Sequence, residues 1–419
     1  MAYHGSVCRR CFLTLKGRRT ASVGAWTLLA VFTALAQTYS GIDYGGTNDP
    51  SQKLDIYMPT AGAKPYPVAV WIHGGRFSEG SRTEANAGEL AGIIGPLGAA
   101  VVSIDYRLSG VAQWPAQIQD CKAAIRWIRA NASKYNFDPN RIAAAGGSAG
   151  GHLSEFVGVT GDITTATSGA VTMDLEGAVG GTTAYSSSVQ AVVPMYGLSD
   201  FLTLMDTCPQ NNPKVSTLDH NAADSPESAL IGGPIQSNKD KCALAAPLHF
   251  VSQNAPPFCI LHGDMDQLVP VCQSITFAAA LRAAFSSNKK ECQFIQYPTL
   301  GHGFDVTTCK DTIRAFLTRS LINIKTAASD RFIGRPEKNL PLHVSGNTLL
   351  VLAKSQADLT IADMLGRTVL VRSLRAASKP EAIDLRSIGP GAFVVWLRGA
   401  QGDILIGPVV HEIPGPILP

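Results

Sequence analysis

The segment G-G-S-A-G at residues 146–150 fits the pattern G-x-S-x-G, in which a serine occupies a sharp turn between a strand and a helix. The apolar run at 142–145 is typical of a buried strand, and the run at 152–159 has helical character. Glycines flank Ser148 where a Cβ atom would collide with the neighbouring strand and helix. Its hydroxyl would stand at a helix N-terminus, whose dipole favours developing negative charge. Because the motif also fits a flexible Gly/Ser loop, the rest of the chain must decide.

A serine hydroxyl is a poor nucleophile until a general base takes its proton. His302 is the predicted base, because it lies in the flexible turn G-H-G-F after the last expected strand of the region, and because the order serine, acid, histidine belongs to this motif. His152 lies one helical turn beyond the serine, and His262 ends an expected strand. Both are predicted to have structural roles.

The base needs a carboxylate that orients it. The loop H-G-D-M-D-Q-L-V-P, residues 262–270, carries two. Asp266 is predicted to reach the histidine because it lies deeper in the loop, and Asp264 is predicted to cap the turn. Asp305, just beyond His302, is a weaker third candidate.

Backbone N–H groups are the usual donors to the oxyanion of a tetrahedral intermediate. Ala149 would supply one, as the residue after the nucleophile. Gly74 or Gly75, in an H-G-G segment after an early apolar strand, would supply the other, although this segment could also be an ordinary turn. Nucleophile, acid, base and oxyanion donors occur in a consistent order, which favours a hydrolase that uses a serine nucleophile.

The elements that must position these residues alternate between strand and helix from about residue 50 to 325. Strands are expected at residues 53–58, 67–73, 99–104, 142–145, 189–195, 258–262 and 292–297, and helices at 85–97, 115–130, 152–159, 275–285 and 312–324. This alternation predicts the α/β class, with a mainly parallel central sheet and helices on both faces. Residues that follow the strands would gather at the carboxyl edge, where such sheets bind ligands.

Both ends of the chain differ from this region. The first 36 residues combine a basic start with a short apolar run and an A-L-A exit, which predicts a signal peptide, or an uncleaved anchor. The apolar run is too short to span a bilayer, and we expect no stable membrane insertion after cleavage. The catalytic domain is placed at 43–327, a linker at 328–341, and a small antiparallel β-sandwich at 342–419, where short apolar runs alternate with turns.

Composition narrows the function classes further. The chain of 419 residues is 45% hydrophobic and 16% charged, as a globular protein is, and its net charge of +3 becomes slightly negative without the predicted signal peptide. We therefore expect no nucleic-acid partner. After residue 36 no C-x-x-C or His/Cys cluster occurs, so neither a metal site nor a cofactor is expected.

Export would permit disulfide bonds. Cys208 and Cys242 are the first candidate pair, because they bracket a loop-rich insertion. Two of Cys272, Cys292 and Cys309 form a second candidate pair. The remaining two cysteines of the catalytic region, Cys121 and Cys259, are expected to be reduced in the core.

Residues 43–325 resemble the α/β-hydrolase superfamily, and within it the bacterial acetylxylan and feruloyl esterases related to the hormone-sensitive-lipase group. The matching stretches include W-I-H-G-G, S-I-D-Y-R-L, F-D-P-N-R-I-A-A-A-G-G-S-A-G-G-H-L, S-P-E-S-A-L-I-G-G-P-I and L-H-G-D-M-D-Q-L-V-P. The resemblance implies Ser148 as nucleophile, Asp266 as acid and His302 as base, with Gly75 and Ala149 as oxyanion donors. It also implies acetyl or feruloyl esters of xylan, or small esters, as substrates.

The sequence departs from many of these relatives directly after H-G-G, where it has Arg76 and Phe77 instead of a third glycine or an aromatic residue. Arg76 is interpreted as a solvated loop residue rather than a substrate contact. Phe77, Trp114 and Tyr196 are weak candidates for substrate binding, and Phe77 and Trp114 could equally anchor loops.

The C-terminal residues 342–406 resemble the β-sandwich tails of bacterial type IX secretion, through L-T-I-A-D-M-L-G-R-T-V-L and I-D-L-R-S-I-G-P-G-A-F-V-V-W-L. This implies a secreted or cell-surface protein, although such a domain could instead bind carbohydrate. The alternatives for the whole chain are a general short-chain esterase or lipase, a peptidase, and an inactive binding protein. The polar insertion at 198–248 argues against the apolar lid of a lipase.

Overall fold

The computed structural model describes residues 38–161, 163–203 and 219–323, together with seven strands between residues 342 and 411. The predicted signal peptide at 1–36 and the predicted linker at 328–341 lie outside the described residues.

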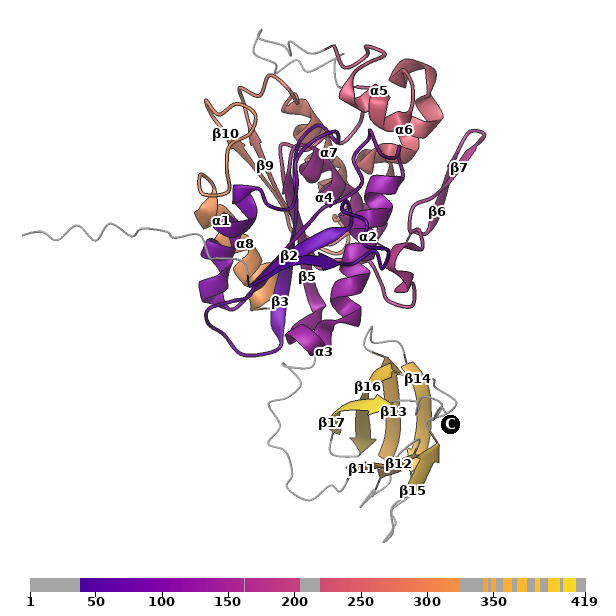
Figure 1. Cartoon of the computed structure of the whole chain (residues 1–419). Helices are drawn as coiled ribbons and strands as arrows, with labels where there is room; N and C mark the ends of the chain where they lie inside the picture. Colours follow the sequence, from indigo (N-terminus) through magenta and orange to yellow (C-terminus); the bar gives the residue numbers. More distant parts are fainter. Residues whose placement is uncertain are drawn as a thin grey trace, which may run out of the picture. The chain divides into compact units, whose positions relative to one another are not determined.

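An eight-stranded sheet forms the centre of the catalytic region (Figure 1). Its strands lie in the order β1-β2-β4-β3-β5-β8-β9-β10. β1 and β2 run antiparallel to their neighbours, and the remaining pairs are parallel. The strand bounds are β1 Tyr39–Asp43, β2 Lys53–Tyr57, β3 Tyr66–Ile72, β4 Ala100–Ile104, β5 Phe137–Gly147, β8 Ala191–Met195, β9 Phe258–Gly263 and β10 Cys292–Tyr297.

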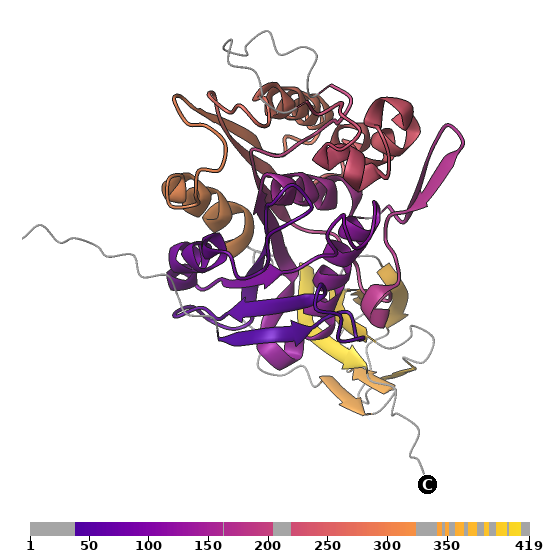
Figure 2. The same cartoon turned by 45° about the horizontal axis from the view of Figure 1, so that its top comes forward.

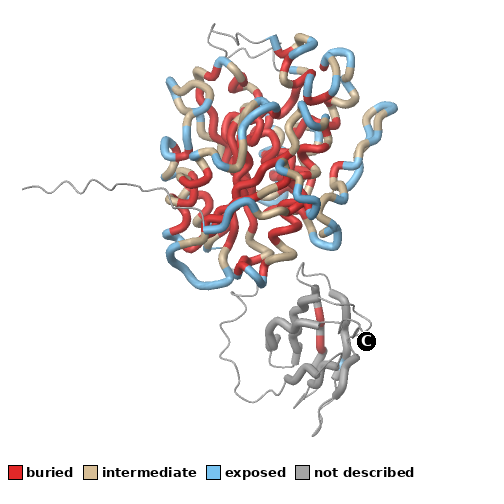
Figure 3. Tube along the Cα trace, viewed as in Figure 1, coloured by how far each residue is buried: buried red, intermediate tan, exposed pale blue. Residues whose placement is uncertain are grey.

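Helices cover both faces of this sheet, because its central strands are apolar on both faces. Along β3, Val68, Val70 and Ile72 belong to one hydrophobic cluster, whereas Ala69 and Trp71 belong to another. Each cluster is completed by helices on its own side, so the centre of the region is buried (Figures 2 and 3). The first cluster includes residues of α2 (Ala116–Ala130), α4 (Ala149–Thr160) and α7 (Cys272–Ala284), and the second includes residues of α1 (Ala85–Ile94) and α8 (Lys310–Leu317). This is the predicted α/β-hydrolase fold.

Two parts of the insertion regions were not predicted. After α4 the chain forms the hairpin of β6 (Thr165–Ser168) and β7 (Val171–Asp174), and after β8 it forms α5 (Pro226–Ile231) and α6 (Lys239–Ala245). The strands have four residues each and the helices six and seven, which is too short for periodicity arguments.

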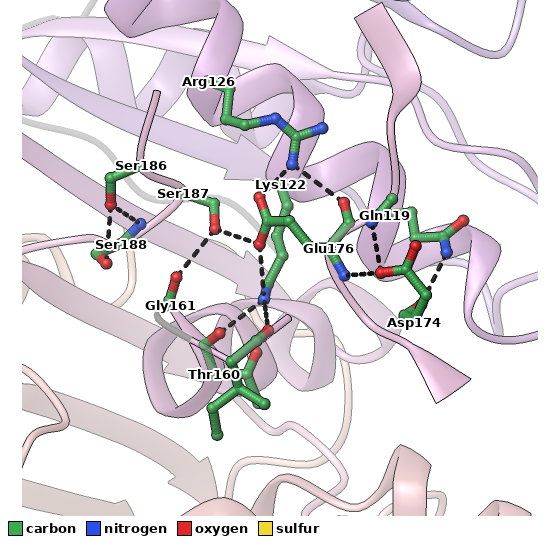
Figure 4. A network of polar contacts seen from close by, with 12 residues as sticks. Gln119, Lys122, Arg126, Thr160, Gly161, Asp174, Glu176, Ser186, Ser187 and Ser188 are labelled. Carbon is green, nitrogen blue, oxygen red and sulfur yellow. Dashed lines mark hydrogen bonds and ion pairs between the residues drawn. The ribbon is translucent and has the colours of Figure 1, made fainter. Parts of the chain in front are cut away.

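A buried ionic network ties the segments around the hairpin to α2 (Figure 4). The ammonium group of Lys122 donates to the carbonyl oxygens of Thr160, at 2.6 Å, and Ile163, at 2.9 Å, and lies 3.1 Å from the carboxylate of Glu176. Arg126 pairs with the same carboxylate. Because both cations are fully buried, each requires these partners to offset its lost hydration.

Seven strands near the C-terminus form two antiparallel sheets, in the orders β11-β12-β15 and β14-β13-β16-β17. Leu359 and Ile361, two positions apart on β13, are both buried, so one face of that strand is covered. The short antiparallel strands predicted for this region are therefore present, and their packing as a β-sandwich stays a prediction. The strand bounds are β11 Leu342–Ser345, β12 Thr348–Val351, β13 Ala357–Asp363, β14 Thr368–Leu374, β15 Glu381–Asp384, β16 Gly391–Gly399 and β17 Gly402–His411.

The cysteines differ from the predicted pairing. Cys242, Cys292 and Cys309 are free thiols, so neither Cys208–Cys242 nor a pair within the second group forms. Cys272 is disulfide-bonded, and its partner lies outside the described residues. The error arose because proximity in sequence does not place two Cα atoms within bonding range. Cys121 and Cys259 are free and buried, as predicted.

Candidate active site

Ser148 occupies the turn between β5 and α4 and has backbone angles of φ 56° and ψ −118°. The turn is tight because strand and helix nearly touch. A Cβ atom at Gly146 would lie 2.5 Å from the carbonyl oxygens of Gly150 and Ile72, and one at Gly150 would lie 2.0 Å from that of Ile72. Glycine is therefore required at both positions, and the resulting strained turn lifts the serine hydroxyl away from the backbone.

The structure brings the three predicted chemical groups into one hydrogen-bonded row. His302 Nε2 lies 2.8 Å from Ser148 Oγ, and His302 Nδ1 lies 2.7 Å from Asp266 Oδ2. These distances allow the imidazole to take the serine proton while the carboxylate holds its orientation and stabilises the imidazolium. The histidine and the aspartate come from the loops after β10 and β9, at the carboxyl edge of the sheet where the serine also lies.

Asp266 is fixed from both sides of its carboxylate. Its Oδ1 accepts hydrogen bonds from the backbone N–H groups of Leu268, at 2.9 Å, and Val269, at 2.8 Å. Its Oδ2 lies 3.2 Å from His262 Nε2 in addition to its contact with His302. Burial alone would raise the pKa of Asp266, but the hydrogen bonds from the two histidines outweigh it and hold that pKa well below its ordinary value.

The two alternative candidates for the acid, Asp264 and Asp305, have other hydrogen-bond partners. The carboxylate of Asp264 accepts a hydrogen bond from the Gln296 side chain at 3.0 Å. The turn is capped by Asp266 itself, so the prediction of a cap at Asp264 is wrong. Asp305 accepts from Thr307 and from the Thr308 backbone, and within the described residues none of its hydrogen bonds reaches His302.

The two histidines predicted to be structural lie in the core. His152 is fully buried, and its Nδ1 lies 2.8 Å from the Leu198 carbonyl oxygen. Burial lowers the pKa of His152 to about 4, so it stays neutral. His262 lies against the Ser274 hydroxyl and the Val269 carbonyl oxygen as well as Asp266. The contact of His262 with Asp266 was not predicted from the sequence, although their spacing of four residues could have indicated it.

The two glycines left open as oxyanion donors differ in their surroundings. Burial raises the pKa of the nearby Glu84 carboxyl, and the backbone of Gly74 and the side chain of Trp71 oppose that rise. Gly75 has a φ of +108°, and a Cβ atom there would lie 2.2 Å from the Glu79 carbonyl oxygen. The amides of Gly75 and Ala149 make no hydrogen bond within the described part of the chain, so both are available, and the choice between Gly74 and Gly75 stays a prediction.

A cavity of about 490 Å³ opens at the row of catalytic candidates. Ser148 and His302 lie in its wall with Gly75, and polar side chains of Arg76 and Asn86 lie there too. A second cavity, of about 30 Å³, reaches the same serine and histidine. Both cavities therefore reach the predicted nucleophile.

The three weak substrate-binding candidates have different surroundings. Tyr196 lines the larger cavity and donates its hydroxyl hydrogen to the Phe304 carbonyl oxygen at 2.9 Å. Its ring packs edge-on against that of His302, with the ring centroids 4.8 Å apart. Phe77 borders the smaller cavity but is only 1% exposed, with its ring against His152. It therefore serves mainly as an anchor for its loop.

Trp114 lines neither of these two cavities, which favours the loop-anchor alternative over substrate binding. Its Nε1 donates to the Leu244 carbonyl oxygen at 3.2 Å, and its ring packs edge-on against Phe156. An aromatic residue before a proline signals a rigid turn as readily as a pocket. Arg76 is exposed, as expected of a loop residue.

The described residues contain no group of three or more His, Cys, Asp and Glu side chains arranged to hold a metal ion. Within the same ranges, no helix has the length and apolar character that crossing a bilayer requires.

Comparisons with known proteins agree with this geometry. Residues 54–281 match the model of the BD-FAE family. The chain is 35% identical over 264 residues to esterase LipC of Mycobacterium tuberculosis, covering 62% of this chain and 58% of that protein. It is 32% identical over 311 residues to the probable carboxylic ester hydrolase LipM of the same organism, covering 69% of this chain and 64% of that protein. The chain thus spans about three fifths of the length of these relatives.

Solved structures show the same relationship. A truncated carbohydrate esterase from gut microbiota is 35% identical, with a TM-score of 0.60, and the match covers 69% of this chain and 97% of that one. A bifunctional GH43-CE protein of Bacteroides eggerthii is 40% identical, also with a TM-score of 0.60, covering 67% of this chain and 38% of that one. With more than half of the chain matched by the family model, this protein belongs to the BD-FAE family of α/β-hydrolase-fold proteins.

Proposed function

We propose that this protein is a serine carboxylesterase that removes acetyl or feruloyl groups from plant cell-wall polysaccharide. The observation that carries the proposal is the row Ser148, His302 and Asp266, with contacts of 2.8 and 2.7 Å. The carbohydrate substrate is supported by the likeness to two carbohydrate-esterase structures at 35% and 40% identity. A general short-chain esterase is the alternative, and the names of LipC and LipM are consistent with it.

The proposed reaction has two steps. Ser148 Oγ attacks the ester carbonyl carbon while His302 takes the hydroxyl proton, and the amides of Gly75 and Ala149 stabilise the oxyanion. The C–O bond to the alcohol then breaks, and His302 returns the proton to the departing oxygen. In the second step a water molecule attacks the acyl-enzyme by the same route, which releases the acid and restores the serine. Asp266 stays ionised throughout and stabilises the imidazolium form of His302.

A side-by-side hydrolysis assay tests the proposal. It compares acetylated xylan, methyl ferulate and a long-chain p-nitrophenyl ester on the protein of residues 43–419, with Ser148→Ala as the control. We expect turnover of the first two substrates, little turnover of the third, and loss of all activity in the variant. A preference for the long-chain ester would move the assignment to a lipase, and activity retained by Ser148→Ala would reject the serine mechanism.

We also propose that the protein is exported and that its C-terminal strands serve secretion or carbohydrate binding. The basic, apolar and small-residue order of the first 36 residues supports export. Fractionation of cells that produce the full chain tests it, with N-terminal sequencing of the exported form. A protein that stays inside the cell with an intact N-terminus would contradict export, and pull-down on insoluble xylan distinguishes a binding role of the C-terminal strands.

A further inference from the structure

A small cavity beside the nucleophile has an acidic wall that the proposed reaction does not use. The cavity has a volume of about 30 Å³ and reaches Ser148, Ala149 and His302. Its other walls include the apolar side chain of Leu198 and the carboxylate-bearing Glu227. A space of this size admits one or two water-sized groups and no sugar ring.

The start of α5 fixes the position of Glu227. The Ser225 side chain accepts a hydrogen bond from the Ser228 backbone N–H and caps the helix, and Pro226 occupies its first turn. Glu227 follows directly and is only 3% exposed. Its carboxylate is therefore held in a defined place against the cavity.

One oxygen of this carboxylate is paired. Glu227 Oε1 lies 3.0 Å from His220 Nδ1, and His220 Nε2 lies 2.9 Å from the Leu268 carbonyl oxygen. Burial alone would lower the pKa of His220, but the hydrogen bond and charge of Glu227 raise it overall. The histidine thus fixes the orientation of the carboxylate and offsets part of its charge.

The other oxygen, Oε2, is buried and accepts no hydrogen bond within the described part of the chain. A buried carboxylate oxygen without a donor is unfavourable, because nothing replaces its lost hydration. A hydrogen-bond donor on a bound ligand would take the place of the lost water molecule. The volume of the cavity limits the donor to a group as small as a hydroxyl.

We propose that Glu227 Oε2 accepts a hydrogen bond from a free hydroxyl group next to the scissile ester, so that the site selects partially esterified sugars. This inference rests on the proposed esterase function. The larger cavity, with a volume of about 490 Å³ and polar side chains from Arg76, Glu79 and Asn86, holds the rest of the sugar. Because both cavities meet at Ser148 and His302, one substrate bound at the nucleophile reaches both.

Matched substrates separate this recognition from the reaction itself. The first is a monoacetylated methyl xyloside with a free hydroxyl beside the acetyl group, and the second is the same ester with that hydroxyl replaced by hydrogen. A third, 4-nitrophenyl acetate, has no hydroxyl. For the wild-type protein we expect kcat/KM to be about tenfold or more higher for the first substrate than for the second, the size of effect that a hydrogen bond to a charged group produces.

Glu227→Gln keeps the side-chain shape and removes the charged acceptor. We expect it to bring kcat/KM for the hydroxylated ester to within about twofold of that for the deoxy ester, mainly through KM, and to leave kcat/KM for 4-nitrophenyl acetate unchanged. Glu227→Ala provides a second variant if the first is poorly folded. Asp224→Asn is the matched control, since this exposed carboxylate lies three residues away on the same segment and should leave every ratio unchanged.

Three outcomes would overturn the inference. Equal rates of the wild-type protein on the hydroxylated and deoxy esters would show that no hydroxyl is recognised. An equal loss on all three substrates in Glu227→Gln would show that Glu227 only positions the catalytic groups. A burst of 4-nitrophenol followed by slower turnover in that variant would show that the cavity serves the hydrolytic water. Failure of the esterase proposal would look different, because the wild-type protein would then hydrolyse none of the three.

Discussion

His262 Nε2 lies 3.2 Å from Asp266 Oδ2, the same oxygen that lies 2.7 Å from His302 Nδ1. Two histidines therefore share one carboxylate oxygen, and the one outside the catalytic row is completely buried. His262 also contacts the Ser274 hydroxyl and the Val269 carbonyl oxygen, so its ring cannot turn freely. This arrangement makes His262 a positioning residue for the proposed acid.

Removing the hydrogen bond from His262 should weaken the proposed reaction without abolishing it. We expect His262→Leu to lower kcat about 10- to 100-fold, the effect of losing a hydrogen bond to a charged group. The pKa of Asp266 is held low partly by this contact, so the loss of activity that follows protonation of Asp266 should begin at a higher pH in the variant. The pH dependence of kcat on 4-nitrophenyl acetate measures both effects.

His262→Gln is the control for this prediction, because its amide N–H can occupy the position of the imidazole Nε2. It should restore most of the rate and return the acidic limb toward its wild-type position. A merely structural role would be indicated if both variants lost activity with an unchanged pH profile.

Replacing the acid itself should have a larger effect. In Asp266→Asn the side chain still caps the turn at Leu268 and Val269, but the neutral amide no longer stabilises a protonated His302. We expect kcat to fall about 10⁴-fold, measured as p-nitrophenyl acetate turnover on protein whose circular dichroism matches the wild type. Asp264→Asn should retain full activity. A comparable loss of kcat in that variant would show that the assignment of the acid to Asp266 is wrong.

The proposed nucleophile, base and acid could be predicted from the sequence, because each lies in or next to a recognisable local pattern. Ser148 requires glycines on both sides. Asp266 follows the apolar run at 258–261, and His302 follows the strand predicted at 292–297. Parallel strands bring their carboxyl ends to one edge, so the contact between residues 154 positions apart follows from topology.

Side-chain environments at long range could not be predicted in the same way. Trp114 contacts Leu244, which lies 130 positions away in the chain, and neither local sequence predicts that contact. Glu227 was part of a recognised stretch, but its place beside Ser148 depends on how the whole insertion folds back.

Gly150, the last glycine of the G-x-S-x-G motif, provides a prediction about backbone packing. A Cβ atom at Gly150 would lie 2.0 Å from the Ile72 carbonyl oxygen and 2.6 Å from that of His73, both of which belong to rigid backbone. We expect Gly150→Ala to push α4 away from β3, to lower the free energy of unfolding by about 1–3 kcal/mol, and to remove most activity. Urea denaturation and ester hydrolysis measure the two effects. The exposed, unobstructed Gly110 offers a control, since Gly110→Ala should alter neither.

Glu155 provides a prediction about the pH dependence of stability. This residue of α4 is fully buried, and neither carboxylate oxygen has a hydrogen-bond partner within the described residues. Burial raises the pKa of Glu155 well above its ordinary value, so the folded protein holds the neutral acid. In the unfolded chain the same group ionises near its ordinary pKa. Its contribution to stability is therefore complete below that value and declines as the pH rises toward the folded pKa.

We expect Glu155→Gln to remove this decline in the free energy of unfolding, because the amide has nearly the same shape as the acid and does not ionise. The variant should gain stability relative to the wild type as the pH rises from 4 to 8, by about 1.4 kcal/mol for each unit that the pKa is raised. Urea denaturation at several pH values measures the difference between the two proteins. Asp311→Asn is the control, since that side chain is 80% exposed and its removal should leave the slope unchanged. A Glu155→Gln variant whose stability parallels the wild type across this range would mean that the carboxyl is ionised in the folded protein and has acquired a partner there.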